Sequence, residues 1–123
     1  LAAIEAGADA IVVSNHGGRV MDHMPGTAEV LPEITNAVGG RIKVLVDGGI
    51  REGIDILKML ALGADAVMIG RPVCIAAFGA GQEGVSFYLR EKLNELKKAM
   101  ILTGCGSIYH IDPSVIFRKK GER

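Results

Sequence analysis

Three short apolar runs form the clearest pattern in the sequence, and they predict β-strands. They are Ala10–Val13, Ile42–Val46 and Ala66–Ile69. None keeps a strict alternation of apolar and polar residues, which is typical of strands buried on both faces of a parallel sheet. The first and third runs each follow a Gly-Ala-Asp segment, at Gly7 and Gly63, and such a glycine suits the end of a preceding helix. The runs begin roughly 20 to 30 residues apart, the spacing of successive β-α units.

Helical patterns fill the segments between these runs. Pro32 suits the first position of a helix that reaches about Val38 and ends at Gly39-Gly40. Apolar residues three or four positions apart predict a second helix over 53–62. The same spacing predicts a long helix from about 83 to 102, which Gly104 should end.

The long predicted helix has two contrasting faces. Its apolar face should pack against the rest of the fold and consists of Val85, Leu89, Leu93, Leu96 and Met100. Its charged face is interpreted as solvated surface and consists of Arg90, Glu91, Lys92, Glu95, Lys97 and Lys98. The tail from Cys105 onward has no regular pattern, and its basic run Arg118-Lys119-Lys120 is also expected to be solvated.

The order of these elements predicts an α/β fold, because alternating strands and helices imply a parallel sheet covered by helices. A doubly wound sheet would carry its glycine-rich phosphate turn after the first strand. Here chemically special residues follow every strand, which favours a (β/α)8 TIM barrel. Three strands are less than half of such a barrel, which needs about 250 residues. Since the chain also opens without a methionine, on what resembles a helix end, we expect 1–123 to be the C-terminal part of a barrel domain, with 104–123 as its tail.

Composition and charge exclude several classes of function. The sequence has 14 Lys+Arg and 14 Asp+Glu, a formal net charge of zero, which argues against nucleic-acid binding and against a polybasic membrane anchor. Hydrophobic residues make up 49% of the chain, enough for a folded core, yet no uncharged apolar run is long enough to span a membrane. Cys74 and Cys105 do not make a disulfide framework, and we interpret them as buried thiols of a cytoplasmic protein without a signal peptide.

The segment Ser14–Arg19, Ser-Asn-His-Gly-Gly-Arg, follows the first predicted strand and is the strongest candidate for chemistry. His16 can act as a base near neutral pH. Arg19 can bind a carboxylate through two parallel hydrogen bonds. Together they suit an acid that loses a proton close to its carboxylate. The alternative is a glycine-rich turn with a hydrogen-bonded histidine, and the position at a strand's carboxyl end makes it the weaker reading.

Two further loops indicate a phosphate site. Asp47-Gly48-Gly49-Ile50-Arg51 follows the second predicted strand, and Gly70-Arg71-Pro72 follows the third. Glycines let backbone N–H groups approach a ligand closely, and the last two loops of a barrel are the usual phosphate site. Arg51 and Arg71 would add charge-assisted bonds, whereas Asp47, an acceptor when ionised, should face hydroxyl groups. The alternative is a pair of ordinary turns with surface arginines.

Other polar residues are weaker candidates. His23 and His110 have no partner at metal-ligand spacing, so no metal site is expected. Tyr88 is expected to pack, and Cys105 likewise, because a reactive thiol needs an electropositive site.

Five motifs appear in a fixed order: Ser14–Arg19, Leu31–Ile34, Asp47–Arg51, Ala61–Ala64 and Ile69–Pro72. In this order they resemble the FMN-dependent α-hydroxy acid dehydrogenase and oxidase family, which includes glycolate oxidase, lactate oxidase and flavocytochrome-type lactate dehydrogenase. The resemblance covers nearly the whole chain, to about Gly104. The first motif is highly specific, whereas the Asp-Gly-Gly and Gly-Arg loops alone are shared with other phosphate-binding barrels.

The resemblance implies a TIM barrel of which this chain supplies the sixth to eighth strands and their helices. It implies that His16 is the active-site base and that Arg19 holds the substrate carboxylate. Contacts with the cofactor FMN are implied for Asp47, Gly48, Gly49, Arg51, Gly70 and Arg71, with Asp47 near the ribityl chain and Gly49, Arg51, Gly70 and Arg71 around the phosphate. The implied reaction oxidises an (S)-2-hydroxy acid to a 2-oxo acid and reduces the flavin. The expected partners are that small acid, the N-terminal part of the barrel and further copies in a tetramer.

The sequence departs from the family in two places near the substrate loop. Val20-Met21-Asp22 stands where Gln-Leu-Asp is common, and Pro25-Gly26-Thr27 stands where Pro-Ala-Thr is common. The family's flavin-ring lysine, its tyrosines and the aspartate partner of the base would lie outside these 123 residues, so the chain alone should be inactive. Two alternatives remain: a barrel of the IMP dehydrogenase-like or type 2 isopentenyl diphosphate isomerase groups, and a non-catalytic half-barrel.

Overall fold

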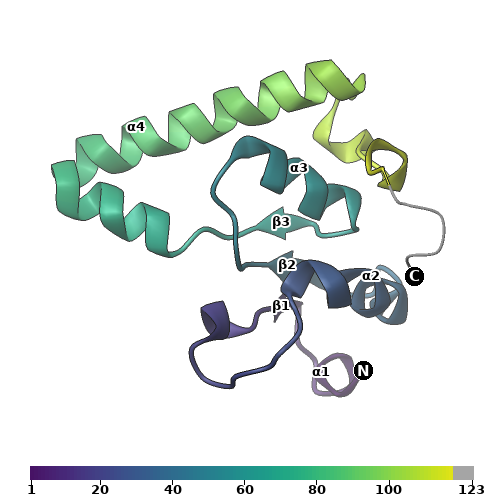
Figure 1. Ribbon diagram of the computed structural model, residues 1–123. Helices are drawn as coiled ribbons and strands as arrows, with labels where there is room; N and C mark the ends of the chain where they lie inside the picture. Colours follow the sequence, from purple (N-terminus) through teal and green to yellow (C-terminus); the bar gives the residue numbers. More distant parts are fainter. Residues whose placement is uncertain (118–123) are drawn as a thin grey trace.

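A three-stranded parallel sheet forms the centre of the computed structural model, which describes residues 1–117 (Figure 1). Its strands are β1 (Ala10–Val13), β2 (Lys43–Val46) and β3 (Ala66–Val67), in the order β1-β2-β3. Val13 pairs with Val46, and Val46 pairs with Val67. This alternating, parallel α/β arrangement confirms the predicted fold class. Because the strands are parallel, the loops that follow them leave the same edge of the sheet.

Within residues 1–117, four α-helices and three short 3₁₀ turns connect and cover the strands. They are α1 (Ala2–Glu5), α2 (Thr27–Val38), α3 (Gly53–Ala61), α4 (Arg71–Thr103), η1 (His16–Gly18), η2 (Ile108–His110) and η3 (Pro113–Val115). The helix predicted over 53–62 is thus confirmed as α3. No helix within residues 1–117 combines the length and the apolar character needed to cross a membrane.

Helix α2 begins earlier than predicted, so Pro32 lies inside the helix and not at its first position. The reason is packing: Thr27 and Leu31, in the part of the helix before Pro32, are both buried, Leu31 completely. Burial of that turn outweighs the local cost of the proline, as tertiary contacts commonly do. The predicted end is correct, since Gly39 adopts a left-handed conformation (φ 59°) after the last helical residue.

Helix α4 is longer than predicted and consists of two parts joined at Ala80-Gly81 (Figure 1). Its second part is the predicted long helix, and Gly104 ends it in a left-handed conformation, as expected. The first part folds back on the second so closely that a methyl group at Gly84 would overlap the carbonyl of Ala76. Several glycines in this segment hid the helical pattern of the first part from the sequence.

The core lies between the sheet and the two helices α2 and α3. Its fully or nearly buried members include Val13, Leu31, Val44, Val46 and Met59. A second cluster joins α3 to α4 through Leu57, Leu96 and Ala99. The first cluster fixes α2 and α3 on the sheet, and the second fixes α3 on α4. The loops at the carboxyl edge of the sheet join these elements, so packing holds the ends of the loops in place.

Three sequence predictions about burial are wrong. The strands are not buried on both faces, because successive side chains point to opposite sides and Val12 is half exposed. The apolar face of α4 packs only near Leu96, while Leu93 is 55% exposed because α3 is shorter than α4 and covers only part of it. Cys74 is exposed and Cys105 only half-buried. The basic run Arg118-Lys119-Lys120 lies outside the described residues.

Candidate functional site

A cavity of about 610 Å³ opens at the carboxyl edge of the sheet, where the loops after β1, β2 and β3 meet. All eight residues singled out in the sequence line it: His16, Arg19, Asp47, Gly48, Gly49, Arg51, Gly70 and Arg71. The remaining lining residues are Gly17, Ile50, Met68, Ile69, Pro72, Ile75 and Tyr88. The cavity therefore combines three guanidinium groups and one carboxylate with an apolar wall.

The loop after β1 presents His16 on a tight left-handed turn. His16, Gly17 and Gly18 have φ values of 55°, 65° and 73°. The turn is held by short-range hydrogen bonds: Ser14 Oγ accepts from the His16 amide at 3.1 Å, and Asn15 Oδ1 accepts from the Gly17 amide at 3.1 Å. Glycine adopts such φ values freely, so the two glycines make this turn possible and leave the exposed imidazole at the cavity.

A hydrogen bond from the first residue of helix α2 holds the loop after β2 in place. Thr27 Oγ1 donates to the Asp47 carbonyl at 2.6 Å. Gly48, with a φ of 97°, lies so close that a Cβ there would be 3.0 Å from Thr27 Oγ1. The side-chain oxygen Asp47 Oδ1 is buried without a hydrogen-bond partner among the described residues. A buried acceptor of this kind calls for a donor, and a ligand hydroxyl in the cavity would supply it.

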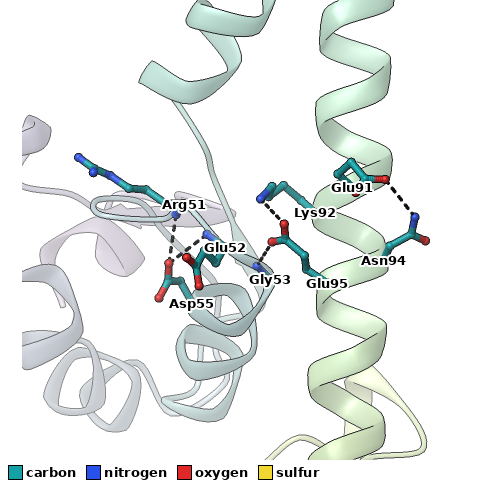
Figure 2. A network of polar contacts seen from close by, with 8 residues as sticks. All are labelled: Arg51, Glu52, Gly53, Asp55, Glu91, Lys92, Asn94 and Glu95. Atoms are coloured by element: carbon teal, nitrogen blue, oxygen red, sulfur yellow. Dashed lines mark hydrogen bonds and ion pairs between the residues drawn. The ribbon is translucent and has the colours of Figure 1, made fainter.

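The end of the same loop carries Arg51 and runs into α3 (Figure 2). Asp55 Oδ2 accepts from the amides of Arg51 and Glu52, both at 3.1 Å. Glu95 Oε2, on α4, accepts from the Gly53 amide at 2.7 Å. Figure 2 shows that the Arg51 side chain extends away from these carboxylates and from α4. Its guanidinium is therefore free of them while its backbone is held.

The loop after β3 leads directly into helix α4. Gly70 precedes the helix without any side-chain hydrogen bond to cap it, so the partial positive charge of the first helical turn faces the cavity. The Arg71 guanidinium lies against the loop after β1, because a Cβ at Gly17 would be 3.0 Å from its Nη2 atom. The first and third loops thus lie side by side. The alternative of ordinary turns with surface arginines does not account for this contact.

The electrostatics of the cavity favour anions. Arg19, Arg51 and Arg71 outnumber Asp47, and the uncapped start of α4 adds to the positive potential. Guanidinium groups bind carboxylates and phosphates through paired hydrogen bonds. Within residues 1–117, no group of three His, Cys, Asp or Glu side chains could hold a metal ion. The arrangement suits a ligand with a phosphate, hydroxyl groups and an apolar portion, together with a small carboxylate.

Sequence reasoning missed several residues that shape the site. Asn15 also donates from Nδ2 to the Pro25 carbonyl at 3.3 Å, which spans the loop; an Asn before two glycines was a signal for such a turn. Tyr88 lines the cavity, and its hydroxyl is buried without a hydrogen-bond partner among the described residues. The pattern of the sequence gave no sign of the cavity contact of Tyr88.

The charged face of α4 is also not plain solvated surface, as the sequence had suggested. The Lys92 side chain is only 13% exposed and forms an ion pair with Glu95 Oε1. The hydrogen bonds from Lys92 and then from the Gly53 amide hold the pKa of the Glu95 carboxyl below its ordinary value. The contact with Gly53 was invisible in the sequence because Gly53 lies on a different element, far away along the chain.

Comparison with known proteins shows that this chain is similar in sequence to oxidases of hydroxy acids. It is 47% identical, over its whole length, to the peroxisomal (S)-2-hydroxyacid oxidase of Arabidopsis thaliana, of which it covers 34%. It is 52% identical over 93% of its length to the L-lactate oxidase of Nostoc sp., covering 31% of that protein. The chain thus spans about a third of the length of these curated relatives.

A solved structure agrees with these similarities. Mandelate oxidase with 3,3-difluoro-2-hydroxy-3-phenylpropionic acid matches with a TM-score of 0.87 and 51% identity, over 91% of this chain and 34% of that one. Residues 1–118 match the family described as FMN-dependent dehydrogenase. The matched range includes all eight predicted site residues and the loops that bring them together. This chain belongs to the FMN-dependent dehydrogenase family.

Proposed function

We propose that this chain carries the FMN- and substrate-binding edge of an enzyme that oxidises an (S)-2-hydroxy acid to a 2-oxo acid. The observation that carries the proposal is the convergence of His16, Arg19, Arg51 and Arg71 on one cavity. The same cavity holds a buried Asp47 oxygen that has no hydrogen-bond partner within residues 1–117. Family membership removes the IMP dehydrogenase-like and isoprenoid isomerase alternatives. The flavin-reduction experiment described below distinguishes this function from a non-catalytic half-barrel.

The residues of the cavity fit FMN. Arg51, Arg71 and the uncapped start of α4 would hold the phosphate. A Cβ atom at Gly49 or at Gly70 would meet no neighbouring atom of the described residues within 4 Å. The backbone at both positions is therefore open to a close ligand. Asp47 would accept from ribityl hydroxyls, and the apolar side chains of Met68 and Ile69 would face the uncharged remainder. When bound, FMN accepts the two electrons that the acid gives up.

The loop after β1 would handle the acid itself. Arg19 binds the carboxylate in a bidentate manner, which fixes C2 of the acid relative to His16. The imidazole of His16 then accepts a proton from the acid at a ring nitrogen. Its turn, held by Ser14 and Asn15, keeps the ring in place so that little reorientation accompanies the step. Lactate- and glycolate-like acids are the substrates that this pair of side chains suits.

The three strands would be the sixth, seventh and eighth of a TIM barrel. The half-exposed Val12 and the exposed Met68 belong on the inward side of such a barrel, where the remaining strands would cover them. The rest of the barrel comes from sequence beyond this chain. The tetrameric assembly, the cytoplasmic location and the tail boundary at residue 104 stay predictions.

The direct test is reduction of bound flavin in the full-length protein that contains this chain. The purified protein should be yellow, and (S)-lactate or glycolate should bleach its flavin absorbance in the absence of oxygen. Matched controls are (R)-lactate, which places its hydrogen on the wrong side, and methyl lactate, which lacks the carboxylate for Arg19.

A colourless protein that takes up no FMN would support a non-catalytic half-barrel and contradict the proposal. Equal bleaching by lactate and its methyl ester would contradict the assigned carboxylate site. After anaerobic reduction, admission of oxygen shows whether oxygen reoxidises the flavin or another acceptor is required.

A further inference from the structure

Glu95 joins two elements that the candidate site needs in a fixed relation. From α4 it accepts the Gly53 amide hydrogen at 2.7 Å, at the first residue of α3. Its other oxygen accepts from Lys92 Nζ, one turn earlier on α4. Lys92 is in turn held over the ring of Tyr88, 5.4 Å from its centroid, and Tyr88 lines the cavity. Figure 2 shows Glu95 between Lys92 and Gly53. Through Lys92 and Tyr88, Glu95 connects the start of α3 with the cavity wall.

The contact between α3 and α4 is unusually close at this point. A methyl group on Gly53 would overlap the backbone of Glu95 and Leu96. Gly53 and Leu96 are buried, so the hydrogen bond from Gly53 to Glu95 is sheltered from water on one side. A charge-assisted hydrogen bond in such a place is stronger than one at an open surface.

Carboxylates occupy the free amides at the start of α3. Asp55 accepts from Arg51 and Glu52, Glu52 accepts from the amide of Asp55, and Glu95 accepts from Gly53. Carboxylates therefore accept from four amides at the start of α3, and their negative charge offsets the partial positive charge of this helix end. At α4, by contrast, no side chain caps the first turn. The starts of α3 and α4 therefore differ, and the Arg51 side chain reaches the cavity from the loop that precedes α3.

We propose that Glu95 is a positioning residue: by anchoring the start of α3 to α4, it holds Arg51 where its guanidinium meets the phosphate of FMN. The inference rests on the proposed function. It assigns no contact between Glu95 and the flavin, and it predicts that the effect of Glu95 passes through Arg51. The effect should therefore be specific for the phosphate-bearing flavin.

The test measures dissociation constants of FMN and riboflavin, which lacks the phosphate, for the full-length apoprotein by quenching of flavin fluorescence. Glu95→Ala should raise the Kd of FMN about tenfold, the size expected for loss of one well-placed charged contact. The Kd of riboflavin should stay within about twofold, a change of only a few tenths of a kcal/mol. Glu95→Gln, whose amide oxygen can still accept from Gly53, should restore most of the FMN affinity.

The matched control is Glu91→Ala, which removes an exposed carboxylate from the same helix; this carboxylate accepts a hydrogen bond from Asn94 on α4 itself. It should change neither constant. A second arm repeats Glu95→Ala in an Arg51→Ala background, where the loss should disappear because the two residues act as one unit. If Glu95→Ala does not fold, Glu95→Asp, which is too short to keep the contact, replaces it in both arms.

Equal weakening of both flavins, or additive losses in the Arg51→Ala background, would overturn the proposal. An unchanged FMN constant would do the same. Failure of the proposed function gives a different result, because the unmodified apoprotein would then bind FMN no more tightly than riboflavin.

Discussion

His16 adopts a backbone conformation that residues with a side chain rarely adopt. Its φ of 55° begins a left-handed turn that two glycines continue. Holding a non-glycine residue there costs about 1–3 kcal/mol, and such strain is concentrated at functional sites. His23 shares the feature, with a φ of 60°, but does not line the cavity. The strained conformation of His16 therefore lowers the stability of the fold while it places the imidazole at the cavity.

Removing that imidazole should stop the chemistry without releasing the cofactor. In the full-length protein, His16→Ala is expected to slow flavin reduction by about 10² to 10⁴-fold, the usual contribution of a general base. FMN content should not change, because the proposed FMN contacts come from other residues, among them Arg51 and Arg71. Anaerobic stopped-flow absorbance measures the rate. A variant that reduced its flavin at the original rate would remove His16 from this role.

Arg19 should govern binding of the acid and not of the flavin. Arg19→Met removes the guanidinium but keeps an unbranched apolar stem, and we expect KM for the acid to rise about 10 to 100-fold, since charged hydrogen bonds are worth about 1.5–3 kcal/mol. Steady-state kinetics with lactate and glycolate would measure this change. If KM were unaffected, the carboxylate would have to bind elsewhere.

The sequence indicated the residues of the cavity better than their supports. Each of the eight candidates follows a strand, and parallel strands bring such residues to one edge, so their convergence could be predicted. Glu95 could not be found this way, because its partner is a backbone amide that carries no side-chain signal. The catalytic and binding roles of the eight residues stay predictions.

At the element scale, Gly53 determines how closely α3 and α4 approach. Ala is intrinsically the better helix residue by about 1 kcal/mol, yet its methyl would overlap the α4 backbone. The overlap should win, and Gly53→Ala is expected to destabilise the protein by about 1–3 kcal/mol, as overpacking of a buried contact does.

The matched control for this prediction is Gly79→Ala, also within a helix, where a Cβ meets nothing within 4 Å. It should be neutral or stabilising. Urea denaturation of the full-length variants compares them. Equal stability of the two variants would show that α3 and α4 can separate at little cost.

Asp65 joins β2 to the segment that leads into β3. Its carboxylate accepts from Lys43 Nζ at 2.7 Å and from the Val44 amide at 2.9 Å. The hydrogen bond from Lys43 first, and then that from Val44, lowers the pKa of Asp65 below its ordinary value of 3.8. A lowered pKa stabilises the fold above that value, and the contribution is lost as the pH falls through the folded-state pKa.

Asp65→Asn should therefore reduce stability at pH 7 by about 1 kcal/mol, the scale of one hydrogen bond and one exposed ion pair. The difference between the two proteins should shrink as the pH falls from 3.8 towards the lowered folded-state pKa of Asp65, below which the native carboxyl is also neutral. Urea midpoints across the pH range measure it. A difference that stayed constant with pH would contradict the ionic contribution.

Elements with strong local signals were predictable, and those fixed by packing were not. The apolar runs located all three strands, and the glycines at 39 and 104 located two helix ends. The start of α2 was misplaced because burial of Leu31 outweighs Pro32. The first part of α4 was missed because its contact through Gly84 with Ala76 is tertiary.

At the scale of the whole molecule, the site lies on one edge of an open sheet. Side chains that a closed barrel would cover are exposed, among them Val12 and Met68 on the strand side, and Phe78 on α4. An unpaired sheet edge is a liability that a barrel removes. The chain spans about a third of the length of its curated relatives, and within it the three loops hold the eight predicted site residues at one cavity.

The most direct test of this account is a crystal structure of the full-length protein with FMN and a 2-oxo acid. We predict the phosphate within hydrogen-bond distance of both Arg51 and Arg71, and the acid carboxylate on Arg19. A His16 ring nitrogen should lie about 2.6–3.2 Å from the C2 oxygen, the reach of a general base. A phosphate bound elsewhere, or His16 and Arg19 directed away from the acid, would contradict the account.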